Sequence, residues 1–214
     1  MGRREDNKAD KRERLLAAGL RTFREEGWGV GSVERIAAEA GVARGTFYLY
    51  FRDKEALFLA LIEALFGPLG DILRETRAAL AACPDAESTA PVYAVLGTRL
   101  AQLLSERSDE VRLVFAEARS PGPAGDAVRA RLAEVAGHTE GILVDAVAKG
   151  ALRPHDPHVV ALAIVGGVER LVEAALAGDP ALDPMRVPGE VTALFQRGLL
   201  PLHAGTAGSR PVSG

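Results

Sequence analysis

Apolar residues recur along most of this chain with the 3.6-residue period of amphipathic α-helices, and no segment alternates as a half-buried strand would. The fold class that this pattern predicts is all-α. The predicted helices cover residues 10–26, 33–40, 53–80, 91–107, 110–118, 126–148, 159–176 and 187–200, with a further short helix after Val42. Residues 1–9 are charged and lack the pattern, so we expect them to be disordered. The residues from Pro201 onward are expected to form a loose tail.

The two shortest patterns, residues 33–40 and the helix after Val42, lie on either side of a glycine. In the first, apolar residues fall at i, i+3, i+4 and i+7, namely Val33, Ile36, Ala37 and Ala40. Ser32 stands where a hydroxyl caps a helix, and Gly41 stands where a residue must turn to positive φ to end one. A small residue at the crossing, a glycine in the turn and an apolar anchor at Phe47 are what a helix-turn-helix requires.

The outward face of the second short helix decides between a helix-turn-helix and an ordinary corner of a helical bundle. Its inward face carries three aromatic residues, at positions 47, 50 and 51. The residues left pointing outward are Arg44, Gly45, Tyr48, Leu49 and Arg52, with Thr46 on the flank. An arginine, a glycine, a threonine and a tyrosine make a poor solvated surface and a good reader of phosphates and base edges. This face therefore favours DNA binding.

Residues 27–58 resemble the DNA-binding domain of the TetR/AcrR family of bacterial transcriptional regulators. The matching runs are residues 36–37, 40–42, 45–46, 50–51 and 54–58, together with Tyr48. Upstream, residues 15–27 resemble the first helix of the family. Gly19 and Thr22 stand where the family usually has Ala and Leu, so we expect that helix to pack more loosely.

The resemblance and the outward face together predict roles for individual residues. Arg44, Gly45 and Thr46 should meet base edges or the nearest phosphates. Gly45 would let the backbone approach, and Arg44 can make a bidentate contact with guanine. The residues expected to hold phosphates are Ser32, Tyr48, Tyr50 and Lys54.

Charge is distributed unevenly along the 214 residues, whose net charge is −3. Residues 1–54 carry 12 Lys and Arg against 9 Asp and Glu, whereas the remainder carries 14 against 20. A nucleic-acid-binding segment attached to an acidic body would have this balance. The only cysteine, Cys83, excludes an internal disulfide and fits a reducing compartment. The N-terminus lacks an apolar signal sequence, and the longest apolar run, residues 159–168, is far shorter than the ~20 residues of a bilayer span. We therefore expect a cytoplasmic protein without a membrane segment.

No signature of catalysis is visible in the sequence. A nucleophile elbow, an HExxH pair, a Walker loop and a Cys–His pair are all missing, and no set of residues resembles a zinc site. The glycine-rich residues 27–31 follow no strand, so we interpret them as a tight turn that carries Trp28 as a plug on the small domain's core. We expect neither an enzyme nor a bound metal or cofactor.

The last two predicted helices carry more apolar surface than a small monomer can bury. Gly166 and Gly167 cost the first of them about 1 kcal/mol each in helix propensity, which is sensible where another helix approaches closely. The prediction is a homodimer in which each subunit contributes both helices to a four-helix interface, and the family resemblance implies the same. The residues expected at its centre are Gly166, Gly167, Leu171, Leu194 and Phe195.

The predicted helix over residues 53–80 is the direct covalent link between the DNA-reading part and the body, and Pro68 inside it predicts a kink. A pocket that moves this helix should lie beside it. The expected apolar lining residues are Phe66, Leu69, Leu96, Leu100, Phe115, Val135 and Leu162. The expected polar groups are Arg119, His138 and Glu169. These residues predict a mainly apolar guest.

The sequence thus predicts a DNA-binding domain over residues 1–53, a ligand-binding and dimerisation domain over 54–202, and a flexible tail over 203–214. The family resemblance implies a repressor that a small molecule releases from a palindromic operator in double-stranded DNA. An activator, or a regulator without a ligand, stays open as an alternative of the same fold. A helical module that binds protein is a more remote one.

Overall fold

The computed structural model describes residues 2–118, 120–180, 182–183 and 186–199, which contain helices and no strand. The helices are α1 (Gly2–Glu26), α2 (Val33–Glu39), α3 (Arg44–Tyr48), α4 (Lys54–Ala82), α5 (Ala90–Glu106), α6 (Ser108–Glu117), α7 (Pro123–Ala148), α8 (Pro157–Leu176) and α9 (Val187–Leu199), with a 3-10 turn at Glu87–Thr89. The predicted tail, residues 203–214, lies outside the described residues. The fold is all-α, as the sequence predicts.

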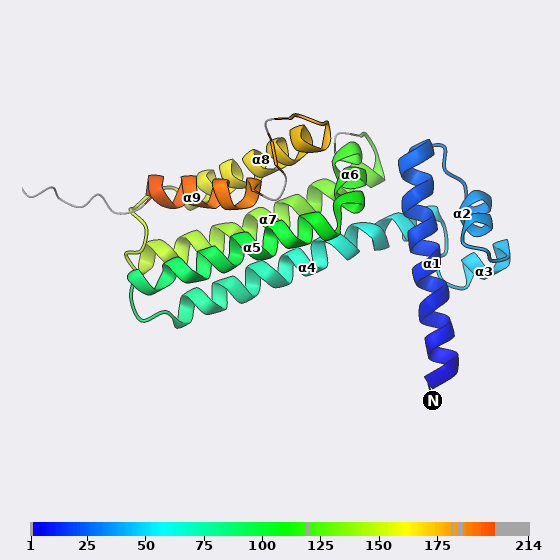
Figure 1. Ribbon diagram of the computed structural model, residues 1–214, viewed down its shortest axis with the longest axis horizontal. Helices are drawn as coiled ribbons and strands as arrows, with labels where there is room; N and C mark the ends of the chain where they lie inside the picture. The colour runs from blue at the N-terminus through cyan, green and yellow to red at the C-terminus, as the bar shows by residue number, and fades with distance from the viewer. Residues whose placement is uncertain (1, 119, 181, 184–185, 200–214) are drawn as a thin grey trace, which may run out of the picture.

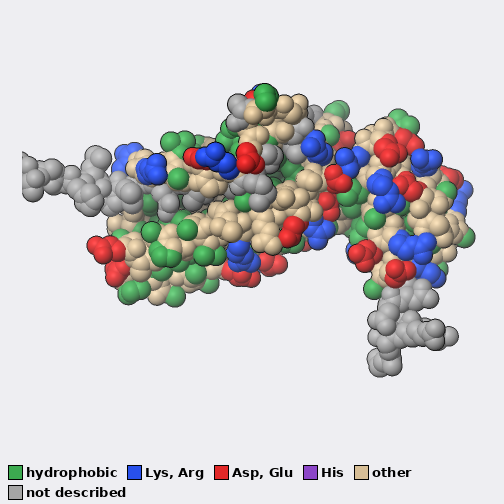
Figure 2. All heavy atoms as spheres, viewed as in Figure 1, with side chains coloured by type: hydrophobic (Ala, Val, Ile, Leu, Met, Phe, Trp, Pro, Cys, Tyr) green, Lys and Arg blue, Asp and Glu red, His purple; other side chains and the backbone are tan. Residues whose placement is uncertain are grey.

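Two parts are visible in Figure 1. The head, residues 2–53, consists of α1, α2 and α3 and stands at one end of the molecule. The body consists of α4 to α9; α4, α5 and α7 run lengthwise, α8 and α9 cover one side, and α6 lies at the end next to the head. In the same view, charged side chains of both signs crowd the head, whereas apolar side chains are frequent over the lower helices of the body (Figure 2).

Three local predictions from the sequence are wrong. The chain is helical from Gly2, where we expected disorder, because five of residues 2–9 (two Arg, one Glu, one Lys and one Ala) have good helix propensity. The spacing before residues 110–118 also predicts Asp109 as the N-cap of that helix, but Asp109 lies in the first turn of α6 and pairs with Arg24 of α1 at 2.7 Å. The apolar pattern of residues 91–107 also predicts Val95 on a buried stripe, but Val95 is 57% exposed because the inward arc of α5 is narrower than this pattern.

The helix-turn-helix forms as its residues predict. Ser32 accepts a hydrogen bond from the Arg35 N–H at 3.2 Å and so caps α2. Gly41 has φ +64°, a conformation that glycine adopts without strain, and it turns the chain toward α3. Phe47 is fully buried and anchors α3 against α1 and α2. Trp28 plugs the core of the head, with ring centroids 5.1 Å from Phe23 and 4.6 Å from Phe58.

The first helix packs tightly, contrary to the expectation from Gly19 and Thr22. A Cβ atom at Gly19 would overlap the Leu57 side chain of α4, so the missing side chain is filled by its neighbour. Thr22 is fully buried and donates a hydrogen bond to Glu39 at 3.1 Å. Arg21 also bonds Glu39 and, as the larger cause, lowers the pKa of that carboxyl group. These contacts hold α1 against both α2 and α4.

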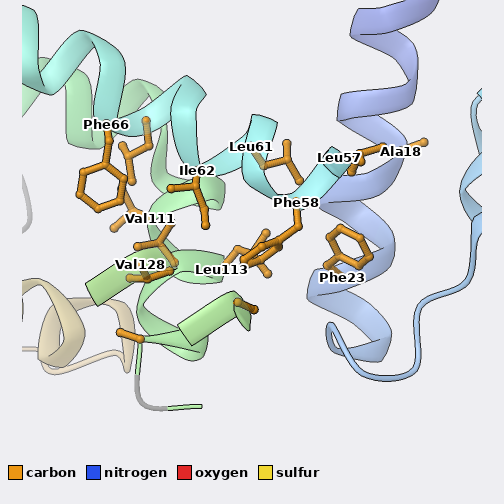
Figure 3. Close-up of a cluster of buried hydrophobic side chains, with 14 of the residues drawn as sticks. Ala18, Phe23, Leu57, Phe58, Leu61, Ile62, Phe66, Val111, Leu113 and Val128 are labelled. Carbon is orange, nitrogen blue, oxygen red and sulfur yellow. The ribbon is translucent and has the colours of Figure 1, made fainter. Parts of the chain in front are cut away.

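A continuous apolar core joins the head to the body (Figure 3). Phe58 at the start of α4 packs near Phe23 of α1, and Phe66, two turns later, belongs to the same cluster as Val111 of α6 and Val128 of α7. By length and composition alone α4 could cross a bilayer, but half of its most apolar stretch is buried in this core. Helix α4 therefore connects the cores of the head and the body. It continues as a helix through Pro68.

The start of α8 is held by two acidic residues. Asp156 accepts hydrogen bonds from the N–H groups of His158 and Val159, which caps the helix. The His158 ring nitrogen Nδ1 lies 2.9 Å from Glu140 of α7. The hydrogen bond to Glu140, and the charge of that residue, raise the pKa of His158 above its ordinary value. The pair therefore ties α7 to α8 when His158 is protonated.

We expect Glu140→Gln to lower the pKa of His158, measured by NMR titration of the imidazole. A raised folded pKa adds stability that is fully present below the unfolded pKa of about 6.5 and is lost as the pH rises through the folded value. In the wild type, the free energy of unfolding should therefore decrease as the pH rises through the pKa of His158. In Glu140→Gln this decrease should be smaller or absent. An unchanged His158 titration would contradict the pairing.

Candidate DNA-binding surface and ligand cavity

Helix α3 presents a short exposed edge of the head. Burial of Phe47 fixes the rotation of this helix, so Arg44, Gly45 and Tyr48 are exposed and Thr46 is half-buried at the flank. A Cβ atom at Gly45 would meet nothing within 4 Å, which leaves the backbone open to close approach. These four residues lie together on one edge, as the sequence predicts.

The Arg44 side chain is held lightly in place. Its guanidinium lies 3.0 Å from Glu34 of α2, donates a hydrogen bond to the Tyr48 hydroxyl at 3.3 Å, and faces the Tyr48 ring with 5.7 Å to the centroid. The bond to Tyr48 and then the charge of Glu34 raise the pKa of Arg44. Because the Arg44 side chain is 62% exposed, these contacts are worth little and can be exchanged for contacts to DNA.

Lys54 has a different place from the one that we expected. Its Nζ donates hydrogen bonds to the carbonyl oxygens of Trp28, Gly29 and Gly31 at 2.9, 3.2 and 3.2 Å, and it lies 4.9 Å from the centre of the Trp28 ring. An ammonium group has three N–H donors, so none is left for a phosphate. The prediction of a phosphate contact conflicts with this geometry because the α1–α2 loop takes up the charge. Lys54 instead fixes the loop that leads into Ser32.

We expect Lys54→Met to destabilise the protein by about 2–3 kcal/mol, because charge-assisted hydrogen bonds contribute more than neutral ones and three carbonyls lose their partner. Urea denaturation followed by the fluorescence of Trp28, the only tryptophan, would measure this loss. Arg52→Met is the matched control, since Arg52 is exposed and, among the described residues, is paired with its neighbour Asp53 alone. Equal stability of the two variants would contradict the assigned role.

The other expected phosphate contacts lie at the surface or close to it. Ser32 uses its oxygen as the acceptor of the α2 cap, and its O–H stays available to donate. Tyr50 is half-buried and packs against the core of the head. Leu49, which we did not select, is 79% exposed beside Tyr48 and could have been found from its outward position in the same pattern. An exposed leucine there can contact a thymine methyl group.

The body contains an apolar cavity of about 180 Å³ between α4, α5, α6, α7, α8 and α9. Seven of the ten expected ligand-binding residues line it: Phe66, Leu69, Leu96, Leu100, Phe115, Val135 and Glu169. The lining residues that sequence reasoning missed include Tyr93, Leu103, Val111, Val114, Leu132, Ile142, Val168 and Val191. Their apolar periodicity marks them as buried but does not distinguish a cavity wall from a filled core.

Three expected ligand-binding residues do not line this cavity in the described structure. Leu162 is 51% exposed on the outer side of α8, so its prediction is wrong; Ile164, Val165 and Val168 are the residues that the helix turns inward. His138 lines a neighbouring polar groove between α4 and α7 instead. Arg119 lies outside the described residues.

The outer side of α8 and α9 carries an exposed apolar face. Leu162 and Leu194, the latter 69% exposed, lie on it, and a Cβ atom at Gly166 or Gly167 would meet nothing within 4 Å. Two further residues expected at the dimer interface, Leu171 and Phe195, are half-buried in the protomer. Leu171 packs against the main core and Phe195 lines the cavity, and their place in a dimer stays a prediction.

A helix-turn-helix head that exposes the edge of its second helix has the arrangement of proteins that place this helix in the major groove of DNA. Residues 15–61 match the family model described as bacterial regulatory proteins, tetR family. The head of this chain is therefore a helix-turn-helix domain of the kind found in TetR-family transcriptional regulators.

A curated relative matches about a third of this chain. The uncharacterized HTH-type transcriptional regulator YerO of Bacillus subtilis is 33% identical over 78 residues, which make up 36% of this chain and 27% of YerO. The match thus spans about a quarter of the length of that relative.

Two solved structures match the whole fold. One is SmeT in its triclosan complex, with TM-score 0.74, 21% identity, and coverage of 95% of this chain and 99% of SmeT. SmeT is the repressor of the Stenotrophomonas maltophilia multidrug efflux pump SmeDEF. The other is the regulator FadR of Bacillus subtilis with stearoyl-CoA, with TM-score 0.70, 22% identity, and coverage of 87% and 98%. At these identities the likeness shows the fold of head and body together.

Proposed function

We propose that this chain is a homodimeric repressor that a small, mainly apolar molecule releases from a near-palindromic DNA operator. The observation that carries the proposal is that the cavity and the head share two helices. Helices α4 and α6 both line the cavity and both pack against α1. A guest in the cavity therefore touches the elements that hold the head in position. Such a regulator acts in the cytoplasm.

The DNA-binding surface of this proposal consists of the exposed edge of α3 and the start of α2. Arg44, Gly45 and Thr46 would meet base edges, and Ser32 and Tyr48 would hold phosphates at either side. Tyr50 contributes from its half-buried position at the end of α3. We assign Lys54 to the support of this surface rather than to the contact itself, because its donors are bound within the head. We place the division between the two domains at the Asp53 cap of α4.

Helix α6 offers the shortest route from the guest to the head. Its inner residues Val111, Val114 and Phe115 line the cavity, and Asp109 in its first turn pairs with Arg24 of α1. A guest shifts the equilibrium between two head positions only by as much as its affinity differs between them. A cavity that is bounded by α6 can supply this difference in affinity, because a displacement of α6 changes the surface against which α1 packs. The repressor assignment has support from SmeT, a repressor of the same fold.

Footprinting on the DNA that flanks the protein's own gene tests the first half of this proposal. A protected near-palindrome, with half-sites about one or more helical turns apart, is the expected result. The same fragment then serves in a screen of apolar and aromatic compounds for release of the bound protein. Protection that persists with every compound would refute the ligand-responsive part and leave the DNA binding intact.

We expect Leu100→Trp to bind the operator normally and to need at least about tenfold more of the effector for release. Leu100 lines the cavity, and an indole would occupy much of its 180 Å³. Val95→Trp is the matched control, because Val95 lies on the same helix and faces solvent. Titration of a preformed protein–DNA complex with effector measures both. Normal release of the Leu100 variant would show that the effector binds elsewhere.

A further inference from the structure

The polar groups of the cavity distinguish between chemical classes of guest. Among its described lining residues, Glu169 is the only one that carries a charge, and Lys, Arg and His do not occur. Thr139 lines the wall too, but its hydroxyl donates to the Val135 carbonyl at 2.9 Å. The remaining walls are apolar apart from Tyr93. An acidic guest would therefore meet a carboxylate and no cation.

Two of these polar groups lack a partner within the described part of the chain. Tyr93 is 8% exposed, and its buried hydroxyl makes no hydrogen bond. Glu169 is half-buried and takes part in no hydrogen bond or ion pair with a described residue. Its neighbours Arg170 and Glu173 pair with each other instead. An unpaired buried hydroxyl costs free energy, so a guest that satisfies it gains affinity.

The polar groove beside the cavity does not supply a free guanidinium either, among the described residues. It shares Phe66 and Val135 with the cavity. Its charged and titratable lining residues are three carboxylates, Glu63, Asp71 and Glu134, two guanidiniums, Arg74 and Arg131, and the imidazole of His138. Arg131 is paired with both Glu63 and Glu134 at 2.7 Å, and Arg74 is paired with Asp71. A negatively charged head group that reached the groove would have to break these pairs. A positively charged one would find a lone carboxylate in the cavity and more carboxylates than guanidiniums in the groove.

The positions of the two unpaired groups define the shape of the guest. Tyr93 and Leu104 both line the cavity, and eleven residues of helix separate their positions by about 16 Å along α5, so the cavity is elongated. Tyr93 packs in the cluster with Leu80 and Ile142, whereas Val168 and Val172, next to Glu169, pack in the cluster that reaches the head. The volume slightly exceeds that of an apolar cavity of about 150 Å³ that binds benzene. A guest of one ring with a short chain fits these dimensions.

We propose that the cavity takes a lipophilic amine whose protonated nitrogen pairs with Glu169, while Tyr93 hydrogen-bonds a second polar atom at the other end of the guest. This proposal rests on the proposed function, since it names the chemical class of its effector. The apolar walls strengthen the ion pair by excluding water, and they raise the cost of leaving Glu169 opposite an anion. Fatty acids and their anionic derivatives are excluded by the same reasoning.

A matched series of probes tests the charge preference: 4-phenylbutylamine, 4-phenylbutanol and 4-phenylbutyrate share one apolar body and differ in the terminal group. Calorimetric titration of the full-length protein with each compound should show the amine binding at least tenfold more tightly than the acid, with the alcohol between them. In Glu169→Gln the amine should fall to the level of the alcohol. Glu173→Gln, one turn later on α8 and partner of Arg170, should leave the order unchanged.

A second variant tests the other end of the guest. An amine with a hydroxyl group on its ring should bind the wild type more tightly than the plain amine, and Tyr93→Phe should remove that advantage without changing the affinity for the plain amine. Equal or tighter binding of the acid, or an unchanged preference in Glu169→Gln, would overturn the proposal. So would a lack of binding by all three probes. In each of these cases the proposed function still stands if other compounds release the protein from DNA, and its ligand-responsive part falls if none does.

Discussion

Replacement of Arg44 by alanine should weaken binding to the operator by about 1–3 kcal/mol and relax the preference at one base pair. Arg44 stands on the exposed edge of α3 with its guanidinium 62% exposed, held only by Glu34 and Tyr48. Breaking an exposed ion pair costs about 0–1 kcal/mol, whereas a bidentate contact to guanine contributes about 1–3 kcal/mol. We therefore expect Arg44 to exchange its contacts within the head for the contact to DNA. Affinities for the operator and for a scrambled duplex, measured at one salt concentration, give the two effects.

Two further variants separate base reading from charge. Arg35→Ala removes the same charge from α2, where Arg35 lies within 4.0 Å of Glu25 and Glu26 of α1, and it should weaken both duplexes slightly and alike. Glu34→Gln frees Arg44 and removes a negative charge from the surface, so it should raise the affinity for both. Equal losses on operator and scrambled DNA for Arg44→Ala would show that this residue holds a phosphate and does not read a base.

The head could be predicted from the sequence because its determinants are local. The apolar spacing before Gly41, the positive φ at Gly41 and the aromatic anchor Phe47 all act within a few residues of one another, and each has the expected place. Lys54 shows the limit of that reasoning. Its role depends on three carbonyl groups that converge from a loop more than twenty residues away, and no spacing rule reveals such a convergence.

The cavity could be predicted only in part, because its helices differ in how clearly their apolar pattern identifies the inward side. On α4 and α5 a clear apolar stripe identifies the inward arc, so Phe66, Leu69, Leu96 and Leu100 have the expected place. Helix α8 is apolar on most of its circumference, so its period does not tell the inner side from the outer one, and Leu162 was assigned to the wrong side. The prediction of loose packing at Gly19 is wrong for a related reason. The space beside a glycine can be filled by a side chain that is distant in the sequence, here Leu57.

Conversion of the outer face of α8 and α9 to an acidic one, by Leu162→Glu together with Leu194→Glu, should yield monomers that bind the operator at least about a hundredfold more weakly. Both side chains are more than half exposed in the protomer, so charge there costs the folded chain little. In a two-fold interface each residue occurs twice, and complete burial of a leucine side chain contributes about 1.5–3 kcal/mol. A monomer then reads only one half-site, which removes a large part of the binding free energy. Light scattering and operator titration measure the two consequences.

The glycines of α8 allow a test that leaves the protomer intact. A Cβ atom at Gly166 or Gly167 meets nothing within 4 Å, and a side chain in place of a helical glycine gains about 1 kcal/mol of helix propensity at most. Gly166→Trp should therefore keep or raise the stability of the isolated chain while it separates the two α8 helices and abolishes the dimer. Val95→Glu, on the exposed side of α5, is the control for added surface charge and should remain dimeric. A dimer that survives both Gly166→Trp and the double glutamate variant would place the two-fold interface on another face of the body, because neither change could be accommodated between closely packed α8 helices.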